Sequence, residues 1–189
     1  KTREPKSRKK KLKIIRIGTS GSLQENVPLG SHLISDYAVG MDNLMNFYDL
    51  EMSAFEETIA KDIQKKTSIS FSPYLVRCSA LLKSQFGPDM IIGNTITAPG
   101  FYAPQGREIR IPLKYPKLLE ELSRYYHKAS NLRLTNFEME TAGYYAMARL
   151  LGHEALSVNA IIANRALNKF SKDPNKVVDS LIKKVLERI

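Results

Sequence analysis

Short apolar runs bounded by turn-forming residues recur along the chain and predict β-strands. The run at residues 12–17 leads into Gly-Thr-Ser-Gly at 18–21, a pattern typical of a strand followed by a loop. Residues 32–39 alternate between apolar and polar side chains and predict a second strand. Further apolar runs predict strands over 90–98, 132–137 and 156–163.

Apolar residues at helical spacing fill the segments between these runs. Ser53 and Glu56 have the spacing of a capping box, and an apolar repeat at positions 55, 59 and 63 accompanies them, which predicts a helix. A second helix is predicted over 74–86, closed by a Gly-Pro pair. Three more helices are predicted on similar grounds: one from residue 116, one over 139–150, and one from Asp173-Pro174 to the end of the sequence.

Strands that alternate with helices, several of them nearly continuous in apolar residues, predict an α/β fold with a sheet covered on both faces. No stretch approaches 18 consecutive apolar residues, so we expect no membrane-spanning helix. The single cysteine, Cys78, falls in the helix predicted over 74–86 and is interpreted as a small buried residue. One cysteine fits a reducing compartment, and we expect a cytoplasmic protein.

The positive charge is concentrated at the start of the chain. Residues 1–13 contain eight basic side chains and one acidic side chain, so they carry +7 of the formal net charge of +10 and the rest of the chain is nearly balanced. Such a segment can bind phosphate backbones nonspecifically. However, no aromatic residue interleaves it to stack on bases, and the spacing of a zinc finger is absent. A solvated basic leader or loop is the preferred interpretation, and nucleic acid is not an expected partner.

Four polar segments follow predicted strands, where ligands gather in open α/β sheets. In the first, Arg16 and Thr19 accompany glycines whose backbone N–H groups suit a phosphate, although this sequence alone is more often a simple turn. In the second, Gln105 and Arg107 can present an amide and a guanidinium to one planar ligand. Phe101 is placed to stack on such a ring, and a polar surface loop is the alternative.

The third and fourth segments add carboxylates and another guanidinium. Glu138 and Glu140 occur where a predicted strand turns directly into a helix, and a ribose diol would supply the polar partners that such carboxylates need. The alternative is the preference of acidic residues for the first turn of a helix, which explains Glu140 better than Glu138. Asn164 and Arg165 follow the most apolar predicted strand, as either a strand-end cap or a ligand contact.

In this order and at this spacing, the segments IRIGTSG, FYAPQGR, NFEMET and IIANR resemble the uridine phosphorylases of the nucleoside phosphorylase superfamily, from about residue 12 onward. The glutamine–arginine pair is the most specific element, because it separates these enzymes from purine-specific relatives. The resemblance implies a three-layer αβα sandwich with a mixed central sheet. It also implies phosphorolysis of uridine to uracil and ribose 1-phosphate in pyrimidine salvage, with phosphate as a co-substrate and no metal or organic cofactor.

The resemblance implies a role for each candidate at the phosphate and the base. Arg16 and Thr19 would hold phosphate. Gln105 and Arg107 would hold the edge of uracil, with Phe101 against its ring. These residues, apart from Phe101, are expected to be catalytic.

The resemblance assigns the remaining candidates to the sugar and to the surroundings of the base. Glu140 would accept a hydrogen bond from the ribose 2′-hydroxyl as a fifth catalytic residue, and Met139 would pack on the sugar. Glu138 has a less definite role in the same motif, and Arg165 would lie near the base, either directly or through water. Purine-cleaving relatives place an acid near this position, and Asn164-Arg165 offers none, which agrees with a pyrimidine substrate.

Full-length members of the superfamily carry a longer N-terminal portion with further phosphate-binding residues and a histidine that serves a neighbouring subunit. We therefore expect residues 1–13 to be a basic leader or loop and residues 14–189 to be the C-terminal two-thirds of a single nucleoside phosphorylase domain, within a homo-oligomer (a dimer or a hexamer). Two alternatives stay open: a purine nucleoside phosphorylase or nucleosidase of the same superfamily, and a nonenzymatic module that binds anions or nucleic acid.

Overall fold

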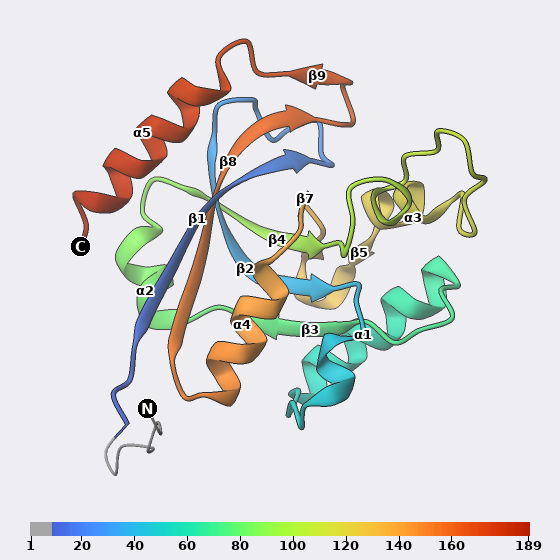
Figure 1. Ribbon diagram of the computed structural model, residues 1–189, viewed down its shortest axis with the longest axis horizontal. Coiled ribbons are helices and arrows are strands. Elements are labelled where there is room, and N and C mark those ends of the chain that lie inside the picture. The colour runs from blue at the N-terminus through green and yellow to red at the C-terminus, as the bar shows by residue number, and fades with distance from the viewer. Residues whose placement is uncertain (1–8) are drawn as a thin grey trace, which may run out of the picture.

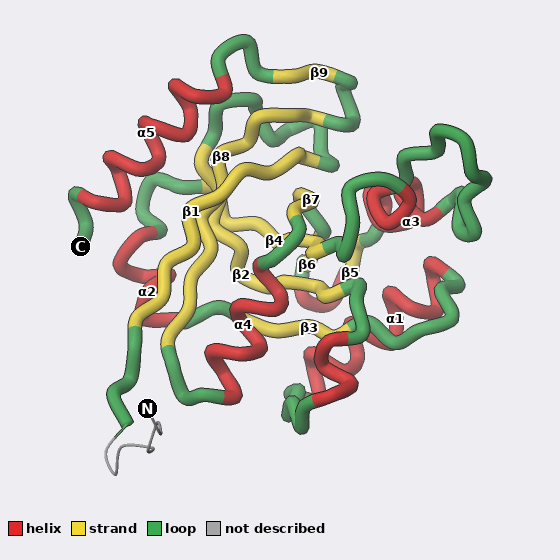
Figure 2. The backbone as a smooth tube through the Cα atoms, in the orientation of Figure 1, coloured by secondary structure: helices red, strands yellow, loops and turns green. Residues whose placement is uncertain are grey.

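A mixed β-sheet with helices packed around it forms the centre of the molecule (Figures 1 and 2). The computed structural model describes residues 9–189. Its elements, in chain order, are β1 (Lys13–Ser22), β2 (His32–Gly40), η1 (Leu44–Phe47), α1 (Ala54–Thr67), β3 (Tyr74–Arg77), α2 (Ala80–Phe86), β4 (Ile91–Thr97), η2 (Ala103–Gln105), α3 (Leu118–Arg124), β5 (Tyr126–His127), η3 (Lys128–Ser130), β6 (Leu132–Arg133), β7 (Asn136–Glu138), α4 (Thr141–Leu150), β8 (Glu154–Asn164), β9 (Lys169–Phe170) and α5 (Pro174–Leu186). The predicted α/β class and mixed central sheet are confirmed.

The strands of the main sheet are hydrogen-bonded in the order β3-β2-β4-β7-β1-β8-β9. β1 and β8 run parallel from Lys13 beside Glu154 to Ser22 beside Asn164, and Figure 1 shows them side by side across the middle of the molecule. β8 also pairs with β2, so the strands β2, β4, β7, β1 and β8 close into a ring. Because the ring is closed, side chains that point inward from these strands share one enclosed space.

Two buried hydrophobic clusters hold the helices against the sheet. The first includes Leu82 of α2, Ala146 of α4 and Leu181 of α5. The second includes Ile63 of α1 and Leu122 of α3. The apolar repeats that predicted these helices therefore mark the faces that are buried, and burial of those faces supplies most of the stability of the short helices.

Three predictions of local structure are wrong in part. The helix predicted over 74–86 is divided, because its first residues form strand β3 on the edge of β2 and only Ala80–Phe86 is helical. The loop predicted at 18–21 is strand, because β1 continues alongside β8 as far as Ser22. The strand predicted over 132–137 is divided between β6 and β7. In the first two cases, pairing with a strand distant in the sequence overrides the local pattern. In the third, β7 pairs with the distant strands β1 and β4, whereas β6 pairs with its neighbour β5.

Cys78 lies between β3 and α2 rather than inside a helix, which follows from the division of the segment over 74–86. Its side chain is buried. Burial, together with the charge of Asp36, raises the pKa of the Cys78 thiol to about 12. The thiol therefore stays protonated at neutral pH, which agrees with its interpretation as a small buried residue.

The predicted basic leader falls largely outside the described residues, which begin at residue 9, and β1 begins at Lys13. None of the helices formed by residues 9–189 combines the length and the apolarity needed to cross a bilayer.

Replacing Ser53 with alanine is expected to lower the free energy of unfolding by about 1 kcal/mol. The capping box predicted at the start of α1 is confirmed: the Ser53 hydroxyl accepts the backbone N–H of Glu56 at 3.2 Å, and the Glu56 carboxylate accepts the Ser53 N–H at 2.9 Å. Urea denaturation measures the loss. Lys65→Ala, at an exposed position of the same helix, is the control and should change stability by less than about 0.5 kcal/mol. Equal stability of the two variants would contradict the assigned role of the cap.

Candidate active site

A cavity of about 800 Å³ opens where four segments distant in the sequence meet. Residues 16–21 of β1, residues 101–107 around η2, the junction of β7 with α4 at 137–140, and the end of β8 with the loop to β9 at 162–170 form most of its wall. All nine side chains that the resemblance assigned to the site contribute to the lining: Arg16, Thr19, Phe101, Gln105, Arg107, Glu138, Met139, Glu140 and Arg165. The four polar segments therefore converge on one cavity.

Arg16 projects from the middle of β1, not from its end, because the strand continues to Ser22. Its Nη1 donates hydrogen bonds to Ser157 Oγ at 3.2 Å and to Asn159 Oδ1 at 3.0 Å. Its Nη2 donates to the Glu140 carboxylate at 2.5 Å and lies 3.2 Å from the Glu138 carboxylate. No residue of the described chain accepts from Nε, so this N–H remains available to an anionic ligand.

The two carboxylates of the 136–140 segment are held in different ways. Glu138 is buried; it accepts the Thr97 hydroxyl at 2.5 Å on one oxygen and the backbone N–H groups of Glu140 and Thr141 at 2.9 and 2.8 Å on the other. It thereby satisfies donors at the start of α4. The Glu140 side chain is half exposed and turns to Arg16. The prediction that helix-terminus chemistry explains Glu140 better than Glu138 is therefore wrong.

A second polar cluster is centred on Gln105, which is buried at the end of η2. Its side-chain oxygen Oε1 accepts from Arg107 Nη1 at 2.7 Å and from Arg165 Nη2 at 2.8 Å. Arg165 also donates to the backbone oxygen of Gln105 at 2.7 Å, and Arg107 to that of Phe101 at 2.5 Å. Because both lone pairs of Oε1 receive guanidinium donors, Nε2 is the part of the amide left to donate to a ligand.

Arg107 and Arg165 make this end of the cavity positive. None of the ion pairs within residues 9–189 includes either guanidinium. Burial lowers the pKa of Arg107, and burial together with the charge on Arg107 lowers the pKa of Arg165 to about 10. Both side chains remain charged at neutral pH. They favour a ligand that is anionic or that presents carbonyl oxygens.

The other candidates complete the wall of the cavity. The Arg107 guanidinium lies over the Phe101 ring, with Cζ 3.7 Å from the ring centroid, so only the other face of the ring can meet a ligand. Met139 is exposed at the edge of the cavity. Thr19 is exposed, and its hydroxyl has no hydrogen-bond partner in the described part of the chain, so it can donate to an oxyanion.

Sequence reasoning missed the residues beneath Arg16. Ser157 and Asn159 are fully buried in β8, inside the run that predicted an apolar strand. The available signal was their polarity, because a buried hydroxyl and a buried amide require hydrogen-bond partners. Thr97, the partner of Glu138, likewise lies in a strand predicted from its apolar neighbours.

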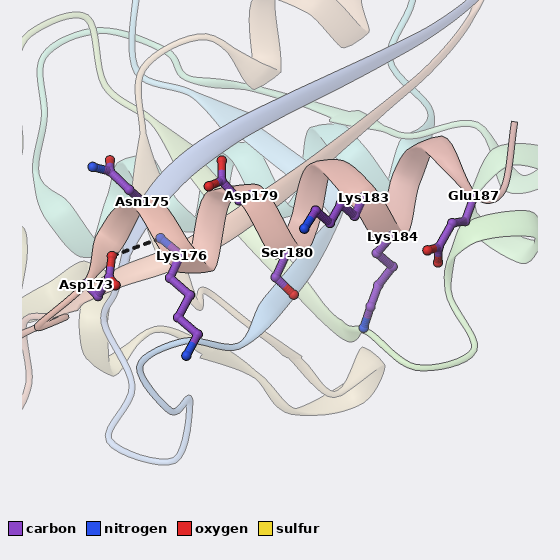
Figure 3. A pocket seen from close by; sticks show the side chains of 8 residues that line it. All are labelled: Asp173, Asn175, Lys176, Asp179, Ser180, Lys183, Lys184 and Glu187. Carbon is purple, nitrogen blue, oxygen red and sulfur yellow. Dashed lines mark hydrogen bonds between the residues drawn. The ribbon is translucent and has the colours of Figure 1, made fainter.

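A second hollow follows the outer surface of α5 (Figure 3). Charged and polar side chains from this single helix and from the residues directly before and after it line the hollow: Asp173, Asn175, Lys176, Asp179, Ser180, Lys183, Lys184 and Glu187. The dashed line in Figure 3 is the helix cap, in which Asp173 accepts the backbone N–H of Lys176 at 3.0 Å. Groups of both signs on one open face do not converge on a ligand, so the cavity beside Arg16 is the candidate site.

Comparisons with known proteins agree with this choice. The family model of the phosphorylase superfamily matches residues 10–188. The uridine phosphorylase of Thermococcus kodakarensis is 27% identical over 162 residues, which cover 86% of this chain and 52% of the relative. Uridine phosphorylase 1 of Mus musculus is 28% identical over 189 residues, which cover 93% and 56%. The chain thus spans about half the length of the curated relatives that it matches.

Solved structures show the same relationship. A Trypanosoma brucei nucleoside phosphorylase, described as showing uridine phosphorylase activity, is 28% identical and superposes with a TM-score of 0.84 over 93% of this chain and 62% of that one. A uridine phosphorylase structure from Phytophthora capsici, 20% identical with a TM-score of 0.57 over 93% and 64%, supports the fold alone. Since the family match extends over nearly the whole chain and the shared fold gathers the four motifs around one cavity, this protein belongs to the phosphorylase superfamily.

Proposed function

We propose that this site cleaves uridine by phosphorolysis and releases uracil and ribose 1-phosphate. The observation that carries the proposal is the presence of two chemically different clusters in one cavity. Arg16 and Glu140 suit an oxyanion next to a sugar diol, whereas Gln105, Arg107 and Arg165 suit a ring with carbonyl oxygens. Similarity to proteins named uridine phosphorylase supports the same substrate class.

At the sugar end, the proposed reaction replaces the base with phosphate at the anomeric carbon. Its transition state has oxocarbenium character, as in the cleavage of glycosides. Arg16 and Thr19 hold the phosphate and orient it towards that carbon, which removes most of the entropic cost of bringing the reactants together. Glu140 leaves Arg16 and accepts a hydrogen bond from the ribose 2′-hydroxyl, and Met139 packs on the sugar.

At the base end, uracil leaves with negative charge spread over its carbonyl oxygens. Gln105 Nε2 donates to one oxygen and Arg107 to the other, and these bonds strengthen as the charge develops. When Arg107 moves to the base, Gln105 Oε1 gains a free lone pair for the N–H of the ring. Arg165 keeps this end positive, and Phe101 covers the ring with its open face.

The remaining features of the proposal follow from the same resemblance. Phosphate acts as a co-substrate, and no metal or organic cofactor takes part. Residues 14–189 form the C-terminal two-thirds of one nucleoside phosphorylase domain, which the partial coverage of the trypanosome chain supports. The active protein is a homo-oligomer, and the lone buried thiol of Cys78 fits a cytoplasmic location.

Release of uracil is expected to depend on added inorganic phosphate, and inosine is expected to have a kcat/KM at least about tenfold below that of uridine, because the base end offers no acid for a purine. Chromatographic measurement of free base in the complete protein, with and without phosphate, tests both points. Release of uracil without phosphate would identify a hydrolytic nucleosidase instead. Efficient cleavage of inosine would overturn the assignment of the base.

A further inference from the structure

The guanidinium of Arg16 lies on a floor formed by β1 and β8. The parallel register pairs Arg16 with Ser157 and Gly18 with Asn159. Residues two apart on a strand share a face, so Arg16 and Gly18 of β1 lie on the same face of the sheet as their partners Ser157 and Asn159 of β8. The hydrogen bonds from Arg16 Nη1 to both Ser157 and Asn159 show that the side chain extends across this face.

Gly18 provides the space for the guanidinium. A Cβ atom at Gly18 would lie 2.2 Å from Nη1 of Arg16 and 2.5 Å from its Cζ, well inside van der Waals contact. Gly18 lies within β1 and is not among the described glycines with positive φ, so its backbone conformation does not require glycine. The absent side chain is therefore what lets the end of Arg16 lie flat against β1.

Ser157 and Asn159 set the direction of the guanidinium from below. Both are fully buried, and neither lines the cavity, so neither can touch a ligand there. Their oxygens accept from Nη1, which leaves Nε and the Nη2 side of the group on the side of Glu140 and the cavity. Ser157 is itself held by the Thr141 hydroxyl at 2.8 Å.

Asn159 is fixed by a chain of buried side chains, here called the polar belt, with one member on each strand of the closed ring. Asn159 Nδ2 donates to Ser35 at 3.0 Å, Ser35 shares a hydrogen bond with Thr95 at 2.5 Å, Thr95 donates to Asn136 at 3.0 Å, and Asn136 donates to Ser20 at 2.7 Å. All five side chains are buried. Because every amide and hydroxyl of the polar belt has a partner, Asn159 cannot turn away from Arg16 without breaking other bonds.

We propose that Gly18, Ser157 and Asn159 are positioning residues: they hold the Arg16 guanidinium in the one orientation that presents its free donors to an oxyanion in the cavity. The inference rests on the proposed function, and it adds three residues that act through Arg16 rather than on the substrate. These three residues are here called the Arg16 seat. If the Arg16 seat is lost, the guanidinium keeps its charge in the cavity but is free to rotate or to stay paired with Glu140. Affinity for phosphate then falls, and the base end is unaffected.

Two variants of the complete protein disrupt the Arg16 seat in different ways. Gly18→Ala fills the space that the guanidinium occupies, and Ser157→Ala/Asn159→Ala removes the two acceptors below it. Each is expected to raise the phosphate KM and the dissociation constant for inorganic phosphate, measured by calorimetry, about tenfold, the effect of one hydrogen bond to a charged group. The KM for uridine should change less than about twofold, because Gln105 is untouched.

Tyr145→Phe is the matched control. The Tyr145 hydroxyl is buried, accepts the backbone N–H of Ser157 at 2.8 Å and donates to the Ser35 backbone at 2.7 Å, but it does not contact Arg16. Its loss therefore removes buried hydrogen bonds from the same region without opening the seat, and phosphate affinity should stay within about twofold of the unaltered protein. Gly18→Ala should leave the melting temperature unchanged, since only the flexible end of Arg16 has to move.

The outcomes separate the seat from the proposed function. If the unaltered protein binds no inorganic phosphate and cleaves uridine without it, the proposed function fails, and the seat fails with it. If the unaltered protein binds phosphate, but Gly18→Ala and Ser157→Ala/Asn159→Ala bind it as tightly as Tyr145→Phe does, the seat is refuted and the function stands. Selective loss of phosphate affinity in the two seat variants supports the proposal.

Discussion

Replacing Arg107 with alanine is expected to lower kcat/KM for uridine by about 10²–10³-fold, the usual effect of losing one donor to a developing oxyanion. Arg107 is one of two guanidinium groups at the base end, and no carboxylate in residues 9–189 forms an ion pair with it. In the proposed reaction, its donors would therefore direct a full positive charge towards the leaving base in a partly buried setting. The loss should appear mainly in kcat, because the bond strengthens in the transition state.

Arg110→Ala is the matched control for this experiment. Arg110 lies three residues further along the same segment, is exposed, and does not line the cavity. Its removal takes away the same charge from the same loop, so kcat/KM should change less than about twofold. Circular dichroism and thermal melting of both variants separate a folding defect from a catalytic one. Turnover by Arg107→Ala at the rate of Arg110→Ala would rule out the assigned role.

Replacing Glu140 with glutamine is expected to produce two opposite effects. Cleavage of uridine should fall about a hundredfold in kcat/KM, because the carboxylate that would accept from the ribose 2′-hydroxyl becomes a neutral amide. Inorganic phosphate should bind the free protein more tightly, about threefold, because Arg16 loses the 2.5 Å ion pair with which an oxyanion competes. Steady-state kinetics and calorimetry with phosphate alone measure the two effects.

Two further variants interpret the Glu140 result. Glu25→Gln, on an exposed position of the loop after β1, removes the same charge away from the site and should alter neither quantity. Glu138→Gln should lower the free energy of unfolding by about 1–3 kcal/mol, because the carboxylate oxygens of Glu138 accept three hydrogen bonds around the start of α4. If Glu140→Gln weakened phosphate binding instead, Arg16 and Glu140 would have to act together on the anion rather than compete.

Much of the fold could be predicted from the sequence because its signals are local. The capping box of Ser53 and Glu56, the Asp173 cap and the apolar repeat that includes Ile63 each depend on residues within one or two turns of helix, and all three appear as predicted. The wrong predictions of secondary structure occur where a local sequence pattern is compatible with more than one kind of local structure. Residues 74–77 are compatible with a helix, yet the free edge of β2 draws them into the sheet.

The composition of the candidate site could also be predicted, because polar side chains next to apolar strands are costly unless they serve a ligand or a cap. Gln105, Arg107, Glu140 and Arg16 were all recognisable in this way, and the structure brings them to one cavity. Their interactions could not be predicted. Arg165 reaches Gln105 across 60 positions of the sequence, and nothing in either segment indicates that two guanidinium groups share one amide oxygen.

By itself, the sequence determined the class of fold, the faces that the helices bury and the set of polar residues available for chemistry. Only the tertiary structure decided that Glu138 supports a helix while Glu140 faces Arg16, and that Arg16 rests on Ser157 and Asn159. For Glu138, the physical reason is the pairing of β7 with β4, and for Arg16 it is the register of β1 against β8. The alternation of residues along a strand decides which face of the sheet a side chain occupies. Which side chains lie next to it on that face depends on the register with a strand more than a hundred residues away, and burial of the whole sheet sets that register.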